Sequence, residues 1–117
     1  RDIEPNAARH AVRLAEALRS ANEVIETRAE SLIADSDQDG DASFFSRIML
    51  RNQERAVLLE LIVQLHHSKT GGQRRDRINQ RSLTTCIGAI YADSGEERLF
   101  DLGGLRIVID SGCVSFS

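Results

Sequence analysis

The feature that most constrains this chain is an uninterrupted helical pattern over its first third. From Asp2 to Ala34 there is no glycine, and the only proline, Pro5, falls where the first turn of a helix tolerates it. Alternating steps of four and three residues pick out a seam in which seven of the eight members are apolar: Ala7, Ala11, Leu14, Leu18, Ala21, Ile25, Arg28 and Leu32. The spacing predicts a helix over about 3–34 with a coiled-coil seam.

A second helix is predicted over about 43–68, and Gly71 and Gly72 supply its C-terminal stop. Its second half is apolar nearly all round, which predicts burial on most sides. We expect the two helices to form a hairpin, and we predict that their apolar faces make the interface with an oligomer partner. The predicted interface residues are Leu14, Leu18, Ile25, Leu32, Val57, Leu58, Leu61, Ile62 and Leu65.

The tail, about 83–117, changes from a helical to an extended pattern. Short apolar runs over 83–91, 98–102, 105–110 and 113–116 alternate with turn residues, which predicts a small antiparallel β-meander. The predicted fold class is therefore α+β. The whole chain, 1–117, is predicted to form a single domain made of a helical hairpin (1–70), a basic connector (71–82) and the meander (83–117).

The length of the predicted helices points to an oligomer. At 1.5 Å per residue they would measure about 45 and 38 Å, whereas a single domain of 117 residues is only about 30 Å across. The helices must then project from the sheet or run past it. The stretch from Val57 to Leu65 would keep an uncovered apolar surface, and a second copy of the chain is the simplest cover. We expect a homo-oligomer, with a dimer favoured over a higher oligomer.

Charge is unevenly spread along the sequence. The net charge of −3 argues against a protein that binds polyanions over its whole surface, yet residues 47–82 carry eight basic and three acidic groups. The candidate contacts to phosphate or nucleic acid in this region are Lys69, Arg74, Arg75, Arg77 and Arg81. The alternative is a solvated connector whose arginines pair with acidic groups of the same chain.

The segment from Asp35 to Asp41 is the most motif-like feature. Asp35, Asp37 and Asp39 alternate, Gly40 permits a sharp turn and Asp41 follows, as in the first half of an EF-hand or dockerin-type calcium loop. The twelfth position of such a loop, however, is a serine here and not the bidentate glutamate. The two readings are a weak calcium site and an acidic connection between the helices.

No catalytic constellation occurs in the sequence. There is no phosphate-binding loop or nucleophile elbow, and the carboxylates gather in one polar segment. Cys86 and Cys113 fall in predicted strands and are expected to be buried thiols of a reducing compartment, the cytoplasm. His66 and His67 are adjacent on a helix and point about 100° apart, so they are not expected to share a metal ion. We predict no cofactor and no enzyme activity.

The sequence therefore predicts a non-catalytic, oligomeric protein-interaction module: an adaptor, an assembly subunit or a regulator. The alternative is a nucleic-acid-binding regulator that uses the arginine-rich segment 69–81, and a second alternative is a weak calcium-binding module. No apolar run is long enough for a membrane span, and no signal peptide is expected. Because the chain begins with Arg1 and not methionine, we expect a fragment or a processed product.

Overall fold

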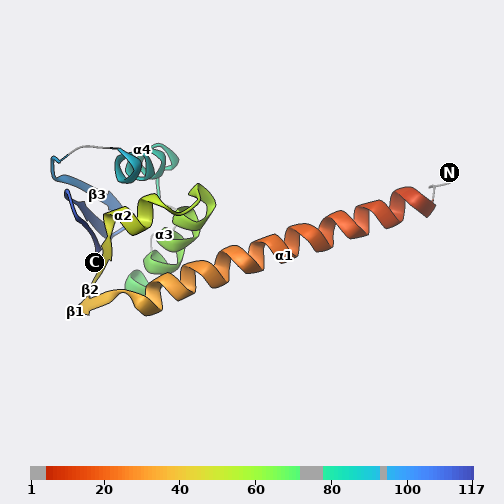
Figure 1. The fold of residues 1–117 in the computed structure, drawn as a ribbon, viewed down its shortest axis with the longest axis horizontal. Coiled ribbons are helices and arrows are strands. Elements are labelled where there is room, and N and C mark those ends of the chain that lie inside the picture. The colour runs from red at the N-terminus through yellow and green to blue at the C-terminus, as the bar shows by residue number, and fades with distance from the viewer. Residues whose placement is uncertain (1–4, 72–77, 93–94) are drawn as a thin grey trace.

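A 31-residue helix, α1 (Pro5–Asp35), runs out from one side of a much smaller α+β body (Figure 1). The structure, a computed structural model, describes residues 5–71, 78–92 and 95–117. The chain measures 59 × 29 × 26 Å along its principal axes, because most of α1 extends beyond the body. The predicted long N-terminal helix is confirmed, with Pro5 at its start.

The predicted second helix over 43–68 is three elements and not one. Strand β2 (Ala42–Ser46) comes first, then the short helix α2 (Arg47–Arg51) and then α3 (Arg55–Thr70). The hydroxyl of Ser46 accepts a hydrogen bond from the Met49 N–H and so caps α2. The predicted stop is confirmed at Gly71, which ends α3 with a left-handed φ of 70°.

The aspartate-rich connection is a β-hairpin. Strand β1 (Asp37–Asp39) pairs antiparallel with β2, and Gly40 turns the chain between them with a φ of 63°. Strand β2 was predicted as helix because the segment is long and lacks turn signals, but Ser43 and Phe45 face the core while their neighbours are more exposed. That alternation is the periodicity of a strand.

The prediction of a strand over 83–91 is wrong, because these residues belong to helix α4 (Gln80–Tyr91). The side chain of Asn79 caps this helix by accepting a hydrogen bond from the Arg81 N–H. Cys86 therefore lies in a helix, whereas Cys113 lies in a strand as predicted. The buried residues of α4 repeat at helical spacing along one side: Leu83, Cys86, Ile87, Ala89 and Ile90.

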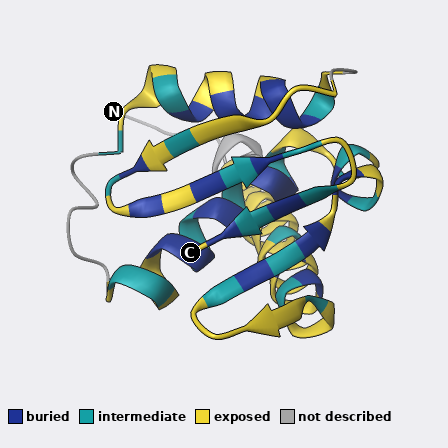
Figure 2. Cartoon of the chain, turned by 90° about the vertical axis from the view of Figure 1, so that its left-hand side faces the viewer, coloured by how far each residue is buried: buried dark blue, intermediate teal, exposed yellow. Residues whose placement is uncertain are grey.

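The meander proper consists of β3 (Arg98–Leu102), β4 (Leu105–Ile109) and β5 (Cys113–Phe116). Strand β5 also pairs with β2, so the complete sheet has five antiparallel strands in the order β1-β2-β5-β4-β3. The helices α2, α3 and α4 cover one face of this sheet, and no described element covers the other face (Figures 1 and 2).

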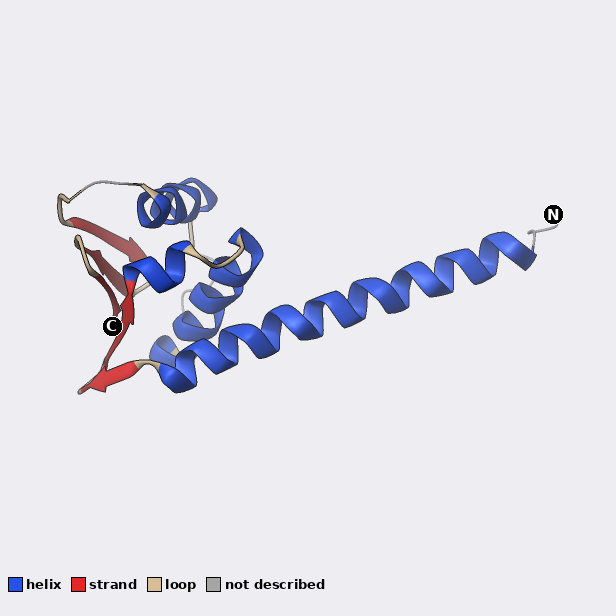
Figure 3. Ribbon diagram, in the orientation of Figure 1, coloured by secondary structure: helices blue, strands red, loops and turns tan. Residues whose placement is uncertain are grey.

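The core lies between the sheet and its helices. The residues Val57, Leu58, Leu61, Ile62 and Leu65 of α3 are 0–6% exposed, and they share one buried cluster with α4 and with the inner side chains of the sheet. The expectation that a second copy covers this stretch is therefore wrong, because the chain covers it with its own elements. The predicted fold class, α+β with a long N-terminal helix and an antiparallel sheet, is confirmed (Figure 3).

Candidate functional site

The part of α1 that leaves the body carries exposed apolar side chains. Val12, Leu14, Leu18 and Val24 are 55–68% exposed, and no other described element lies beside this part of the helix (Figure 1). Soluble proteins rarely keep a row of large apolar side chains in water unless it serves as a contact surface. We call the members of the predicted seam within this part, Ala11, Leu14, Leu18 and Ala21, the bare seam.

The body already covers the C-terminal end of the same face. Ile25 is half-buried, Ala29 is fully buried and Leu32 is 5% exposed. At 100° per residue these three positions fall on the side of α1 that also carries the bare seam. Helix α3 crosses α1 here, and the Gln64 side chain donates a hydrogen bond to the Glu26 carbonyl oxygen at 3.2 Å. The bare seam therefore belongs to the same face of α1 that α3 covers near the C-terminal end of the helix.

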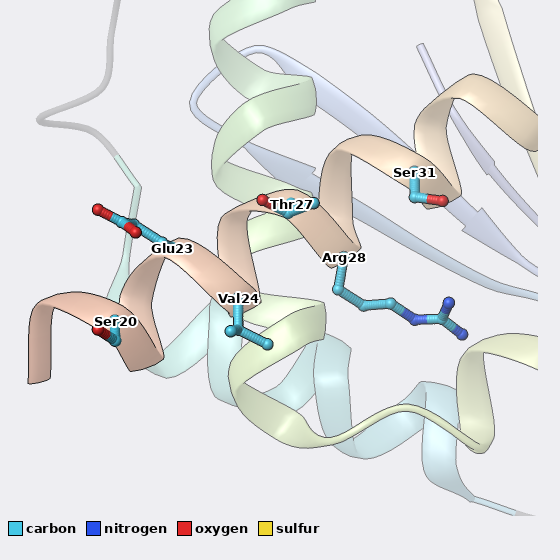
Figure 4. A pocket seen from close by; sticks show the side chains of 6 residues that line it. All are labelled: Ser20, Glu23, Val24, Thr27, Arg28 and Ser31. Carbon is cyan, nitrogen blue, oxygen red and sulfur yellow. The ribbon is translucent and has the colours of Figure 1, made fainter. Parts of the chain in front are cut away.

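Arg28 is the single charged member of the seam, and the body holds its side chain. Its Nε donates a 3.1 Å hydrogen bond to the Gln53 side-chain oxygen, in the connection between α2 and α3. Figure 4 shows the guanidinium reaching from α1 toward that connection. The charge therefore lies at the edge of the body and not within the bare seam.

The flanks of the bare seam are uncharged. The residues beside it are small or apolar, namely Ala15, Ala17, Asn22 and Val24. The six charged residues between positions 9 and 26 all fall on the remaining positions of the heptad, away from the seam: Arg9, Arg13, Glu16, Arg19, Glu23 and Glu26. This segregation of charge is visible in the sequence. It widens the uncharged surface on which another helix could pack.

A hollow on the neighbouring side of α1 offers little for a small molecule. It has a volume of about 610 Å³, and α1 supplies its lining (Figure 4). Ligand sites usually enclose most of the ligand's surface, whereas the described lining of this hollow comes from a single helix: Ser20, Glu23, Val24, Thr27, Arg28 and Ser31. The seam is the more distinctive surface of the helix.

The structure divides the predicted interface residues into two groups. Leu14 and Leu18 are exposed, and Ile25 lies at the border of the body. The other six are buried within the chain: Leu32, Val57, Leu58, Leu61, Ile62 and Leu65. Of the predicted interface residues, Leu14 and Leu18 are therefore the two that the described chain leaves fully accessible to a partner.

The arginine-rich segment is described only at its ends. Arg74, Arg75 and Arg77 lie outside the described residues. The Lys69 Nζ donates a hydrogen bond to the Asp41 carbonyl oxygen at 2.5 Å, and Arg81 is exposed in the first turn of α4. The nucleic-acid alternative stays a prediction.

The four aspartates of the proposed calcium loop are distributed along the hairpin. Asp35 ends α1, Asp37 and Asp39 lie opposite Phe44 and Ala42 in the β1–β2 ladder, and Asp41 lies in the turn beside Gly40. Over residues 5–71, 78–92 and 95–117, no three histidine, cysteine or acidic side chains come together in a group that could hold a metal ion. Calcium binding also stays a prediction.

The two thiols are free and are held in their protonated form. Burial raises the pKa of Cys86 to about 12, although Arg98 nearby opposes the shift. Burial likewise raises the pKa of Cys113, and the negative charge of Asp110 adds to the effect. A thiol with a raised pKa is a poor nucleophile near neutral pH.

His66 is a structural residue of the core. It is 1% exposed, and its Nε2 lies 3.0 Å from the Gly103 carbonyl oxygen in the turn between β3 and β4. This contact ties α3 to the sheet. Its neighbour His67 is exposed, so the two rings point in different directions as expected.

Arg47 is the buried residue that the sequence did not reveal. It is 3% exposed, and its guanidinium donates to the carbonyl oxygens of Ala89, Ile90, Ala92 and Asp110 at 2.6–3.4 Å. Two of these carbonyls belong to the last turn of α4, where a helix lacks internal donors. Arg47 therefore caps α4 and joins it to the turn between β4 and β5.

Comparisons with known proteins give no identity. No protein-family model, curated protein or solved structure matches the chain significantly. None of the described helices is both long enough and apolar enough to cross a membrane. A functional proposal therefore has to rest on the arrangement of the chain itself.

Proposed function

We propose that the chain is a non-catalytic protein-interaction module that associates with a second copy of itself through the projecting part of α1. The observation that carries the proposal is the bare seam, whose large members Leu14 and Leu18 are more than half exposed. The body forms its own core, and the C-terminal part of α1 packs on it. An adaptor, an assembly subunit or a regulator would use such a helix to position its partner.

The stability of helices supports this proposal. Most of the stability of helices in proteins comes from packing an apolar face, and a helix alone in water lacks that contribution. Only the last part of α1 packs on the body, so the first part gains by pairing. Two exposed leucines with small alanines beside them suit the close approach of a second helix.

The chemistry of the body supports the non-catalytic part of the proposal. Both thiols have raised pKa values, and the described histidine, cysteine and acidic side chains form no group of three or more that could hold a metal ion. Both cysteines are also free thiols, and we propose the cytoplasm as the location because a reducing compartment keeps thiols in this state.

A matched pair of variants tests the proposal. Leu18 and Val12 are 59% and 57% exposed on the same helix, but only Leu18 belongs to the bare seam. Sedimentation of Leu18→Glu is expected to show a dissociation constant at least 100-fold above that of the wild type, with Val12→Glu changing it less than 5-fold. Equal effects of the two variants, or no association in the wild type, would refute the proposal.

A further inference from the structure

We infer that the two copies of α1 pair antiparallel, with Leu14 of one copy beside Leu18 of the other and Ala11 beside Ala21. This inference rests on the proposed self-association and adds the orientation and the register of the pair. It is carried by the position of the body on α1, by the position of Arg28 and by the charges of the two halves of the helix.

The body blocks a parallel pair. Helix α3 packs on the seam face from Ile25 to Leu32. A partner helix running in the same direction along the seam would continue into this occupied face and collide with α3. It would also bring the Arg28 residues of the two copies opposite each other, where like charges repel. The α1 helix of an antiparallel partner instead begins, at Pro5, near the edge of the body.

The length of the bare seam sets the register. When Leu14 lies beside Leu18 of the second copy, position 7 of that copy lies opposite Ile25, where the cover by α3 begins. A shift by one heptad toward the body would place position 7 opposite Leu32, which α3 buries. A shift by one heptad in the other direction would leave Ala21 unpaired. The inferred register is the longest overlap that α3 permits.

The charges of the helix favour the same orientation. Residues 9–19 contain three arginines and one glutamate, whereas residues 20–30 contain three glutamates and one arginine. An antiparallel pair sets the basic half of each helix beside the acidic half of the other, and it also opposes the two helix dipoles. A parallel pair sets each half beside a half of the same sign.

Cysteine cross-linking tests the inference on the full chain. In a Cys113→Ser background, Ala11→Cys and Ala21→Cys protomers are mixed and treated with a short bis-maleimide. Cys86 is fully buried and remains unlabelled. The antiparallel register predicts covalent dimers in the mixture and less than one tenth of that yield for either variant alone, because like positions lie about 15 Å apart along the axis.

Each outcome of this experiment has one meaning. Dimers from each variant alone, with none added by mixing, would establish a parallel pair and overturn the inference. A wild type that sediments as a dimer but gives no cross-link in any mixture would place the interface elsewhere and would also overturn it. A wild type that sediments as a monomer would refute the proposed function itself, and the cross-linking result would not be needed to show it.

Discussion

One apolar face runs along α1, and it is covered near one end of the helix and exposed near the other. Near the C-terminus of the helix, α3 covers this face and leaves Ala29 and Leu32 buried. Toward the N-terminus the same face continues through Leu18 and Leu14, and none of the described elements lies against it. The comparison teaches that the heptad pattern specifies a packing surface without specifying whether the same chain supplies the partner.

The largest expected difference in unfolding free energy is between two arginine variants, one in the body and one on the projecting helix. Replacing Arg47 with alanine leaves buried carbonyl oxygens without a donor, and we expect the free energy of unfolding to fall by about 3–5 kcal/mol. Arg13→Ala, on the exposed helix, is expected to change it by less than about 0.5 kcal/mol. Urea titration followed by the fluorescence of Tyr91, the only tyrosine in a chain without tryptophan, measures both. Similar losses of unfolding free energy in the two variants would show that the buried Arg47 stabilises the fold no more than an exposed arginine does.

A smaller contrast lies within the seam itself. Leu32→Ala removes a buried side chain at the contact with α3, and we expect a loss of about 2–4 kcal/mol in the same titration. Leu18→Ala, measured at a concentration below the dissociation constant, is expected to cost less than about 1 kcal/mol because its side chain is already in water. A cost for Leu18→Ala equal to that for Leu32→Ala would show that the bare seam packs within its own chain.

The pH dependence of stability should also reside in the body. Hydrogen bonds from the N–H groups of Gly112 and Cys113 lower the pKa of Asp110 from 3.8. The folded state then binds fewer protons than the unfolded state, so this contribution is present above about pH 3.8 and is lost as the pH falls through the lower folded value.

Asp110→Asn isolates that contribution, because the amide oxygen can still accept both hydrogen bonds while the charge is gone. We expect the difference between the unfolding free energies at pH 6 and pH 3 to be smaller in this variant than in the wild type. Urea titrations at the two pH values measure it. An unchanged difference would mean that Asp110 does not contribute to acid sensitivity.

A small effect is also expected at the border between the two regions. Arg28→Ala removes one exposed hydrogen bond to Gln53, and we expect the free energy of unfolding to fall by less than about 1 kcal/mol. Thermal unfolding of the variant beside the wild type is a sufficient measurement. A loss as large as that of Leu32→Ala would show that Arg28 holds the helix on the body.

The sequence predicted an element correctly where one periodic pattern of apolar residues extends over a long stretch of the chain. Helix α1 was predictable because its pattern repeats over 30 residues on one side. Helix α4 was misread as a strand because Thr84, Thr85, Ile87 and Ile90 are β-branched, and β-propensity is outweighed here by burial at helical spacing. A single strand as short as β2 gives too few residues for its alternation to outweigh a neighbouring helical pattern.

The role of Arg47 could not be predicted, because its partners lie 42 to 63 residues away in the sequence. The candidate surface was predictable in part. Leu14 and Leu18 belong to the predicted seam, but the sequence also assigned the apolar residues of α3 to the interface. Only the arrangement of α4 and the sheet over α3 shows that the chain buries these residues itself.

The mass of the wild-type chain in solution tests the central claim most directly. Light scattering across micromolar concentrations is predicted to give an average mass that rises with concentration toward twice the 13.0 kDa mass of one chain. A constant 13.0 kDa over the whole range would contradict the account, because the bare seam would then remain in water without a second copy.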